Sequence, residues 1–355
     1  LWSTSDDFYM SNPTRTRIQE SLSELAKYFA AISKIRPDVE ARRTATAPTP
    51  RGLRKLQREI HDQLVRLEQP SNGNQPGAGI HGLITRLSRQ QTVVQFHMGD
   101  KDLLVFVHES GKKRAVKYTD GTRILNSLMA RWRFLVECAP PPRKRTPSDC
   151  LNDEKRILER IAGWLLPPLE LANRTNRLLL VPEGQLWSLP WMGLPVDDGV
   201  LGAQFLLTFA PSLRHHAHAQ RQKTRSNRIK MFIGDTHGLP HIRREVEAVS
   251  SCLNIDDSDV HLRCQRADWP DSSHAHIWHY AGHASLRSDN PFYSSLLLSD
   301  GPLFAADFRL KRNTVGLVTL AACRTGQQTS LPGEEASGLV RSLLEMGAGN
   351  VVAGS

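Results

Sequence analysis

Two short segments each combine an apolar run with a single reactive side chain. The run Ile277–Ala281 leads through Gly282 to His283, and the run Leu317–Ala322 leads to Cys323. Each run has the length and composition of a buried strand. A thiol and an imidazole within hydrogen-bonding reach form a nucleophile and base, because the imidazole takes the thiol proton and later protonates the leaving amine. We therefore predict Cys323 as a nucleophile and His283 as its base.

Catalysis by such a pair also needs backbone N–H groups that bind the oxyanion of the tetrahedral intermediate. The turns that carry the pair offer the N–H groups of Gly282, Ala284 and Cys323, and we predict these three as donors. The alternative for Cys323 is structural, because a cysteine after an apolar strand is often a small buried residue.

Four histidines between residues 274 and 283 raise the question of a metal site. His274 and His276 share one face of the predicted strand, whereas His279 lies on the other face. No second group of ligand-type residues has a spacing suited to zinc. We therefore predict no metal and no cofactor, and we expect His279 to be buried with its ring hydrogen-bonded.

Apolar strands alternate with helices from about residue 148 onward. Helices are predicted over 153–165, 245–253 and 334–346, and this alternation indicates a mainly parallel α/β sheet covered on both faces. Active sites in such sheets lie at the carboxyl ends of strands, so the two segments that carry His283 and Cys323 should meet there. The strands are predicted at 178–181, 206–209, 231–233, 276–280, 296–298, 315–321 and 350–352.

The first part of the chain has a different pattern. Residues 1–80 contain apolar residues at helical spacing followed by a Gly- and Pro-rich linker, which predicts an N-terminal helical segment. Residues 91–118 alternate as in a small antiparallel meander, and a helix is predicted over 121–137. We expect one large domain over 81–355, with the meander and helix in 81–150 and the catalytic part in 151–355.

The composition of the chain restricts the cellular compartment and the partners that we expect. The five cysteines are odd in number and irregularly spaced, which favours a reducing compartment over a disulfide scaffold. No signal peptide or apolar stretch of about 20 residues is present, so we expect a cytoplasmic protein. The net charge of +10 suggests contact with nucleic acid or an acidic partner, and the alternative is scattered solvated charge, because no RNA- or DNA-binding motif accompanies the basic residues. Because the chain begins at Leu1 and ends within a predicted strand, we expect a piece of a longer protein.

Beyond the reactive pair, several motifs occur in a characteristic order. From about Gln91 to Ser355 the chain resembles the CHAT domain, a caspase-like domain often attached to TPR repeats. The motifs that carry the resemblance are Arg177–Gly184 with Leu189-Pro190-Trp191, Leu239-Pro240 with Glu245-Val246-Glu247, His279–His283, Pro291 with Ser294–Leu296, Leu320–Gly326, and Gly333-Glu334 with Gly338-Leu339 and Gly347-Ala348.

The resemblance implies a caspase-like fold and a cysteine endopeptidase. It assigns Cys323 as nucleophile and selects His283, not His279, as base, and it implies a thioester acyl-enzyme on a protein substrate. It also implies regulation by an upstream TPR or other helical region, and a role in bacterial defence or cell death.

The chain departs from the family pattern beside both members of the pair. Ala284 stands where the family has glycine, and Arg324 stands where it has glutamate. These departures leave open a CHAT-like interaction module that no longer cleaves. The net charge of +10 leaves open a subunit of a nucleic-acid-containing assembly. Asp307 and Arg324 are candidates for the substrate pocket, and the alternative for Asp307 is a helix cap.

Overall fold

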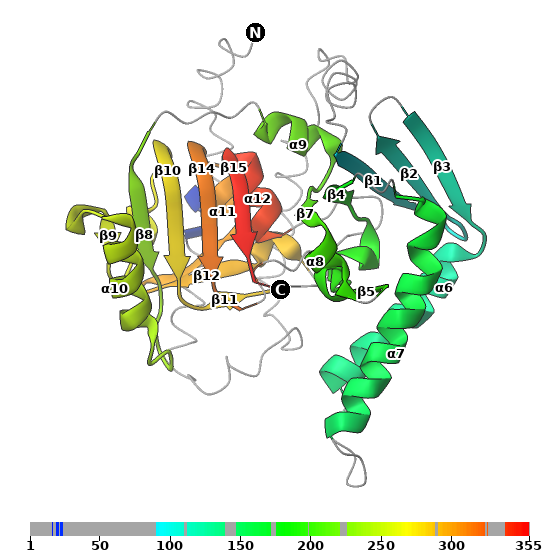
Figure 1. Cartoon of the computed structure of the whole chain (residues 1–355). Helices are drawn as coiled ribbons and strands as arrows, with labels where there is room; N and C mark the ends of the chain where they lie inside the picture. The colour runs from blue at the N-terminus through cyan, green and yellow to red at the C-terminus, as the bar shows by residue number, and fades with distance from the viewer. Residues whose placement is uncertain are drawn as a thin grey trace. The chain divides into compact units, whose positions relative to one another are not determined.

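The computed structural model describes residues 90–109, 112–138, 147–171, 175–197, 199–220, 226–287, 290–323, 325 and 338–354, with a few helical positions between 16 and 23. These residues fall into two compact units, one within 75–217 and the other mainly from 218 onward. Figure 1 shows the elements of each unit. Apart from the positions named, the helical segment expected in 1–80 lies outside the described residues.

The first unit is built on a mixed five-stranded sheet in the order β3-β2-β1-β4-β7. The predicted meander is confirmed, because β1, β2 and β3 pair antiparallel in sequence order. β4 and β7 then extend the sheet parallel to β1. The strands are β1 (Gln91–Met98), β2 (Leu103–Glu109), β3 (Lys112–Tyr118), β4 (Arg177–Val181) and β7 (Leu206–Phe209).

The position of β4 and β7 differs from the expectation that all later strands share one parallel sheet. β4 aligns with β1, with Val93 opposite Leu179. Both strands are apolar, and apolar composition does not say which of several buried strands a given strand will adjoin. The described strands before about residue 217 therefore belong to the first unit and the later strands to the second, whereas the sequence analysis expected a subdivision at residue 150.

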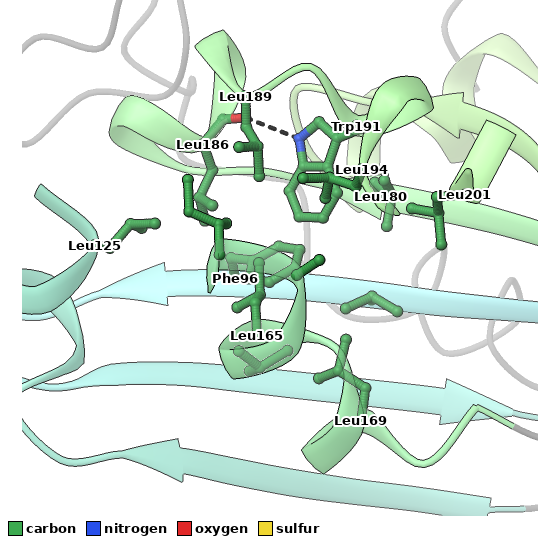
Figure 2. Close-up of a cluster of buried hydrophobic side chains, with 14 of the residues drawn as sticks. Phe96, Leu125, Leu165, Leu169, Leu180, Leu186, Leu189, Trp191, Leu194 and Leu201 are labelled. Atoms are coloured by element: carbon green, nitrogen blue, oxygen red, sulfur yellow. Dashed lines mark hydrogen bonds between the residues drawn. The ribbon is translucent and has the colours of Figure 1, made fainter. Parts of the chain in front are cut away.

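One face of this sheet is covered by α6 (Gly121–Arg133), α7 (Pro147–Leu165) and α8 (Leu201–Gln204), with short turns and the short strands β5 (Pro195–Val196) and β6 (Gly199–Val200). α9 (Leu213–Ala219) lies on the other face, where Leu213 packs with Val93 and Leu179. Trp191, in a 3-10 turn, packs on Phe96 of β1 with ring centroids 5.3 Å apart, and its indole N–H donates to the Leu186 carbonyl at 2.8 Å. Figure 2 shows this cluster, so the Leu-Pro-Trp motif forms hydrophobic core in this unit.

The second unit contains the predicted parallel sheet. Its strand order is β15-β14-β10-β8-β9, and every neighbouring pair is parallel. The strands are β8 (Ile229–Ile233), β9 (Val260–His261), β10 (Ser272–Ala281), β14 (Arg312–Ala321) and β15 (Ala348–Ala353). β10 and β14 begin earlier than predicted, because their first residues are polar and carry no apolar signal.

Both faces of the parallel sheet carry helices. α10 (Ile242–Leu253) packs on the face that presents Met231, Ile233 and Ala281. α11 (Ala305–Arg309) and α12 (Leu339–Met346) pack on the opposite face, which presents Trp278 and Val318. This arrangement is the one expected for a buried parallel sheet.

A small antiparallel sheet follows the end of β10, and the sequence analysis did not predict it as a separate sheet. It consists of β11 (Ala284–Ser285), β12 (Ser295–Leu298) and β13 (Gly301–Phe304), in that order. Because β11 begins one residue after His283, this sheet supports the segment that carries the predicted base.

An aromatic cluster packs beneath the small sheet's neighbour β10, which leads to His283. Trp269 stacks on Phe232 with centroids 4.2 Å apart and meets Trp278 edge-on at 5.5 Å. Tyr280, fully buried, extends this cluster toward the carboxyl end of β10. In the part of the chain that is described, no helix has the length and apolar character needed to cross a membrane.

Candidate active site

The carboxyl ends of β8, β10 and β14 lie side by side (Figure 1). Ala281 is directly opposite Ala321, and the Gly282 N–H donates to the Ala321 carbonyl at 3.3 Å. His283 lies two residues after the end of β10, and Cys323 lies two residues after the end of β14. Neighbouring strands therefore bring the two predicted residues to the same edge of the sheet.

The imidazole of His283 has a defined hydrogen bond. Its Nε2 lies 2.7 Å from the carbonyl oxygen of His237, in the loop between β8 and α10. A carbonyl oxygen can only accept, so Nε2 carries the proton in this contact. The neutral ring therefore has an unprotonated Nδ1, which is the form that a general base requires.

The backbone of His283 is held as firmly as its ring. Its carbonyl accepts from the Leu297 N–H at 2.9 Å and from the Tyr280 hydroxyl at 2.7 Å. The same hydroxyl lies 2.9 Å from the Leu297 carbonyl. Burial raises the pKa of Tyr280, so the phenol stays protonated and remains a donor. Tyr280 thus links the backbone of His283 to β12 through hydrogen bonds.

Two glycines make room for this hydroxyl. A Cβ on Gly234 would lie 2.4 Å from the Tyr280 hydroxyl and 2.3 Å from the Leu297 carbonyl. A Cβ on Gly282 would lie 2.8 Å from the same hydroxyl, and Gly282 has a φ of +153°. Only glycine fits at these two strand ends, because any side chain would displace the tyrosine or the backbone.

Cys323 is exposed at the turn that follows β14. The Thr325 hydroxyl donates to the Ala322 carbonyl at 3.1 Å and accepts from the Gly354 N–H at 3.2 Å. Thr325 itself is 1% exposed. This buried hydroxyl therefore closes the cysteine turn and links it to the residue after β15.

The predicted oxyanion donors have different positions. The Gly282 N–H donates to the Ala321 carbonyl at 3.3 Å, so this N–H already has a partner in the structure, and its oxyanion role stays a prediction. The bond from the Leu297 N–H to the His283 carbonyl makes these two residues a hydrogen-bonded pair of the antiparallel ladder. The next pair, Ala284 and Leu296, is then non-bonded, and the Ala284 N–H points away from β12. Ala284 and Cys323 stay as predicted donors.

His279 is separate from this arrangement. It is 9% exposed, its Nδ1 lies 2.7 Å from the Thr319 hydroxyl, and its Nε2 lies 3.4 Å from Glu245 Oε1. Burial lowers the pKa of His279, and the nearby Glu245 opposes that shift. The prediction of a buried, hydrogen-bonded His279 is confirmed. Among the described residues, no group of three or more His, Cys, Asp or Glu side chains is placed to hold a metal ion.

Asp307 has a structural position. It is 5% exposed, its Oδ2 accepts from the Phe304 N–H at the start of α11 at 2.8 Å, and its Oδ1 pairs with Arg266 at 2.7 Å. The capping interpretation is confirmed. Both oxygens of this carboxylate are bonded inside the protein, which favours the structural role, and the substrate-pocket role of Asp307 stays a prediction. Arg324 lies outside the described residues.

Some of the basic side chains behind the positive charge have acidic partners. Lys117 lies 2.7 Å from Asp102, and Arg228 lies 2.7 Å from Asp259. Such pairs reduce the local positive potential. Contact with nucleic acid stays a prediction.

Comparison with protein families supplies an independent result. A sequence model of the CHAT domain matches residues 155–354, which is more than half of the 355 residues. This chain belongs to the CHAT domain family. The matched region of this CHAT domain includes the Leu-Pro-Trp core motif, His283 and Cys323, and the family is related to caspase-like peptidases. The meander β1–β3 precedes the match. Comparison with curated proteins gave no match.

Sequence reasoning missed two groups of the site, the His237 carbonyl and the Tyr280 hydroxyl. Tyr280 stood inside an apolar run and was assigned to the core. His237 lies in the segment Gly234–Gly238, whose glycines and aspartate indicate a turn at a strand end. That signal indicates a turn but does not reveal which backbone carbonyl faces His283.

Proposed function

We propose that this CHAT domain is a cysteine endopeptidase with Cys323 as nucleophile and His283 as base. One observation carries the proposal above the others. His283, at a strand end beside that of Cys323, donates its Nε2 proton to the His237 carbonyl, which leaves Nδ1 as the proton acceptor. A histidine with only a packing role has no need of an exposed carbonyl partner at the catalytic edge of the sheet.

The reaction begins with transfer of the Cys323 thiol proton to Nδ1 of His283. The thiolate attacks the carbonyl carbon of the scissile peptide bond, and the negative charge moves to the carbonyl oxygen. The Ala284 N–H, which points away from β12, is one donor that supports this charge. The C–N bond then breaks, the amine leaves with the proton held by His283, and the acyl group stays on the sulfur as a thioester.

Hydrolysis returns the site to its starting state. His283 removes a proton from a water molecule, the hydroxide attacks the thioester carbon, and the C–S bond breaks. The products are a carboxylic acid and the Cys323 thiolate, which recovers its proton from His283. The hydrogen bond to the His237 carbonyl stabilises the imidazolium that forms in both halves of the reaction.

The experiment uses an acyloxymethyl ketone peptide probe, which alkylates only an activated thiol. Mass spectrometry of the full chain should locate the label on Cys323, with exposed Cys252 as the internal reference. Cys323→Ala and His283→Ala should each abolish labelling and cleavage of a protein target. Cleavage retained by either variant would exclude the dyad.

A second candidate function is a CHAT domain that binds partners without cleaving them. The observation that favours it is the hydrogen bond from the Gly282 N–H to the Ala321 carbonyl, which competes with the predicted oxyanion role of that N–H. This function predicts no labelling of Cys323 by the probe beyond that of Cys252. It also predicts that partner capture is unchanged in Cys323→Ala.

Further proposals rest on the family resemblance or on the composition of the chain. We propose a cytoplasmic protein whose target is a protein, whose activity is regulated by a helical or TPR region, and whose role is in defence or cell death. Full activity of the chain with no partner present would contradict the regulation. A salt-dependent gel shift with RNA or DNA would support contact through the basic surface, and no shift at low salt would exclude it.

A further inference from the structure

The His237 carbonyl belongs to a four-residue turn. The Leu239 N–H donates to the Thr236 carbonyl at 3.0 Å, and Gly238, at the third position, has a φ of +75°. A positive φ at the third position is the requirement of a type II turn, in which the central peptide is flipped relative to a type I turn. The closing bond of this turn uses the Thr236 carbonyl, so the His237 carbonyl is left for His283.

Asp235 connects this turn to the sheet. Its backbone N–H donates to the Leu297 carbonyl at 2.7 Å, and the preceding Gly234 N–H donates to the Ala281 carbonyl at 3.0 Å. Its side chain then reaches forward, and Oδ1 accepts from the His237 N–H at 3.1 Å. The backbone at Asp235 is therefore fixed by β10 and β12, and the carboxylate extends that constraint to His237.

We propose that Asp235 is a positioning residue, which holds His237 so that its carbonyl keeps the proton of His283 on Nε2. The catalytic consequence rests on the dyad proposed above, whereas the effect on the His283 ring does not. The chain of contacts is short: the Asp235 carboxylate binds the His237 N–H, and the His237 carbonyl binds His283 Nε2. Loss of the first contact frees the backbone of the residue whose carbonyl makes the second.

A competing role for Asp235 is electrostatic. It is exposed at the same edge as Cys323, where a carboxylate attracts a basic side chain of a substrate. The two roles differ in what asparagine does. Asp235→Asn keeps an oxygen that accepts from the His237 N–H but removes the charge, whereas Asp235→Ala removes both.

The first measurement is the protonation of the His283 ring, by NMR of the full chain labelled with ¹⁵N-histidine. His283→Gln identifies the signals. The spectra are recorded at pH 8.5 with Cys323→Ala as the common background, so that no thiolate pairs with the ring. The parent and Asp235→Asn should each show one protonated and one bare ring nitrogen in His283, and Asp235→Ala should show two averaged signals. Gly238→Ala, which opposes the positive φ while keeping Asp235, should also give averaged signals, so the test survives if Asp235→Ala fails to fold.

The second measurement is the rate of alkylation of Cys323 by iodoacetamide at pH 6.5. An ordinary thiol with a pKa of about 8.5 is only about 1% thiolate at this pH, so an activated Cys323 reacts well above Cys252. Asp235→Ala should slow Cys323 about tenfold toward the ordinary thiol, and Asp235→Asn should stay within about twofold of wild type.

The outcomes separate the two proposals. If His283→Gln leaves the alkylation of Cys323 unchanged, the dyad fails, and the NMR signals still decide the role of Asp235. If Asp235→Ala keeps the ring signals of the parent, or if Asp235→Asn loses as much as Asp235→Ala in both measurements, the positioning role is wrong. A loss by both variants that is confined to cleavage of basic substrates would assign Asp235 to the electrostatic role.

Discussion

Replacing Asp307 with alanine removes a buried carboxylate that has two partners. The Arg266 guanidinium, whose side chain is 19% exposed, would keep the Pro302 carbonyl at 2.5 Å but lose its counter-charge. The Phe304 N–H at the start of α11 would lose its acceptor. Breaking a buried ion pair from one side costs up to about 3–5 kcal/mol, because the remaining charge, here the Arg266 guanidinium, stays largely shielded from water.

That cost should be visible in thermal unfolding. At about 2–4 °C per kcal/mol for a domain of this size, Tm should fall by about 6–20 °C. Asp307→Asn keeps an acceptor for the Phe304 N–H and should lose less. Differential scanning calorimetry of the full chain measures both, and the double variant with Arg266→Ala should show a coupling energy of about 1–3 kcal/mol.

The control is a surface ion pair of the same type. Lys101 lies 3.6 Å from Asp120, with side chains 71% and 37% exposed, so Lys101→Ala should change stability by less than about 1 kcal/mol. An unchanged Tm in Asp307→Ala would refute the structural role. An altered preference of cleavage sites with that unchanged Tm would return Asp307 to the substrate pocket.

Three more predictions concern the edge that carries the site. Thr325→Val removes both hydrogen bonds that close the cysteine turn, so alkylation of Cys323 at pH 6.5 should slow while Cys252 is unaffected. Gly234→Ala should destabilise the protein by about 1–3 kcal/mol in urea unfolding, because its Cβ would overlap the Tyr280 hydroxyl, whereas Gly163→Ala, in open space on α7, should be neutral or stabilising. Burial lowers the pKa of His279 below its ordinary value of 6.5, so the unfolded chain binds that proton more readily than the folded protein does. The contribution of His279 to the free energy of unfolding should therefore be full above about pH 6.5 and should decline as the pH falls. His279→Gln should flatten this decline between pH 5 and 7.

Much of the fold followed from local patterns. Period-two alternation predicted the meander of β1 to β3, and apolar runs predicted β8, β10 and β14 within a few residues of their bounds. Strand partners were harder, because a run such as Leu178–Val181 is equally apolar beside any neighbour. Its pairing with β1 depends on how two distant segments meet.

The sequence by itself predicted the candidate pair His283 and Cys323 and determined the strands that precede them, because residue type and position at a strand end are local properties. It also determined the family, through motifs in order. Only the tertiary structure decided that the Gly282 N–H is occupied, that Asp307 faces Arg266, and that His283 donates to a carbonyl 46 residues away. The physical reason is that these contacts use backbone groups, which every residue has, or pairs brought together only by folding. Residue type therefore does not reveal them.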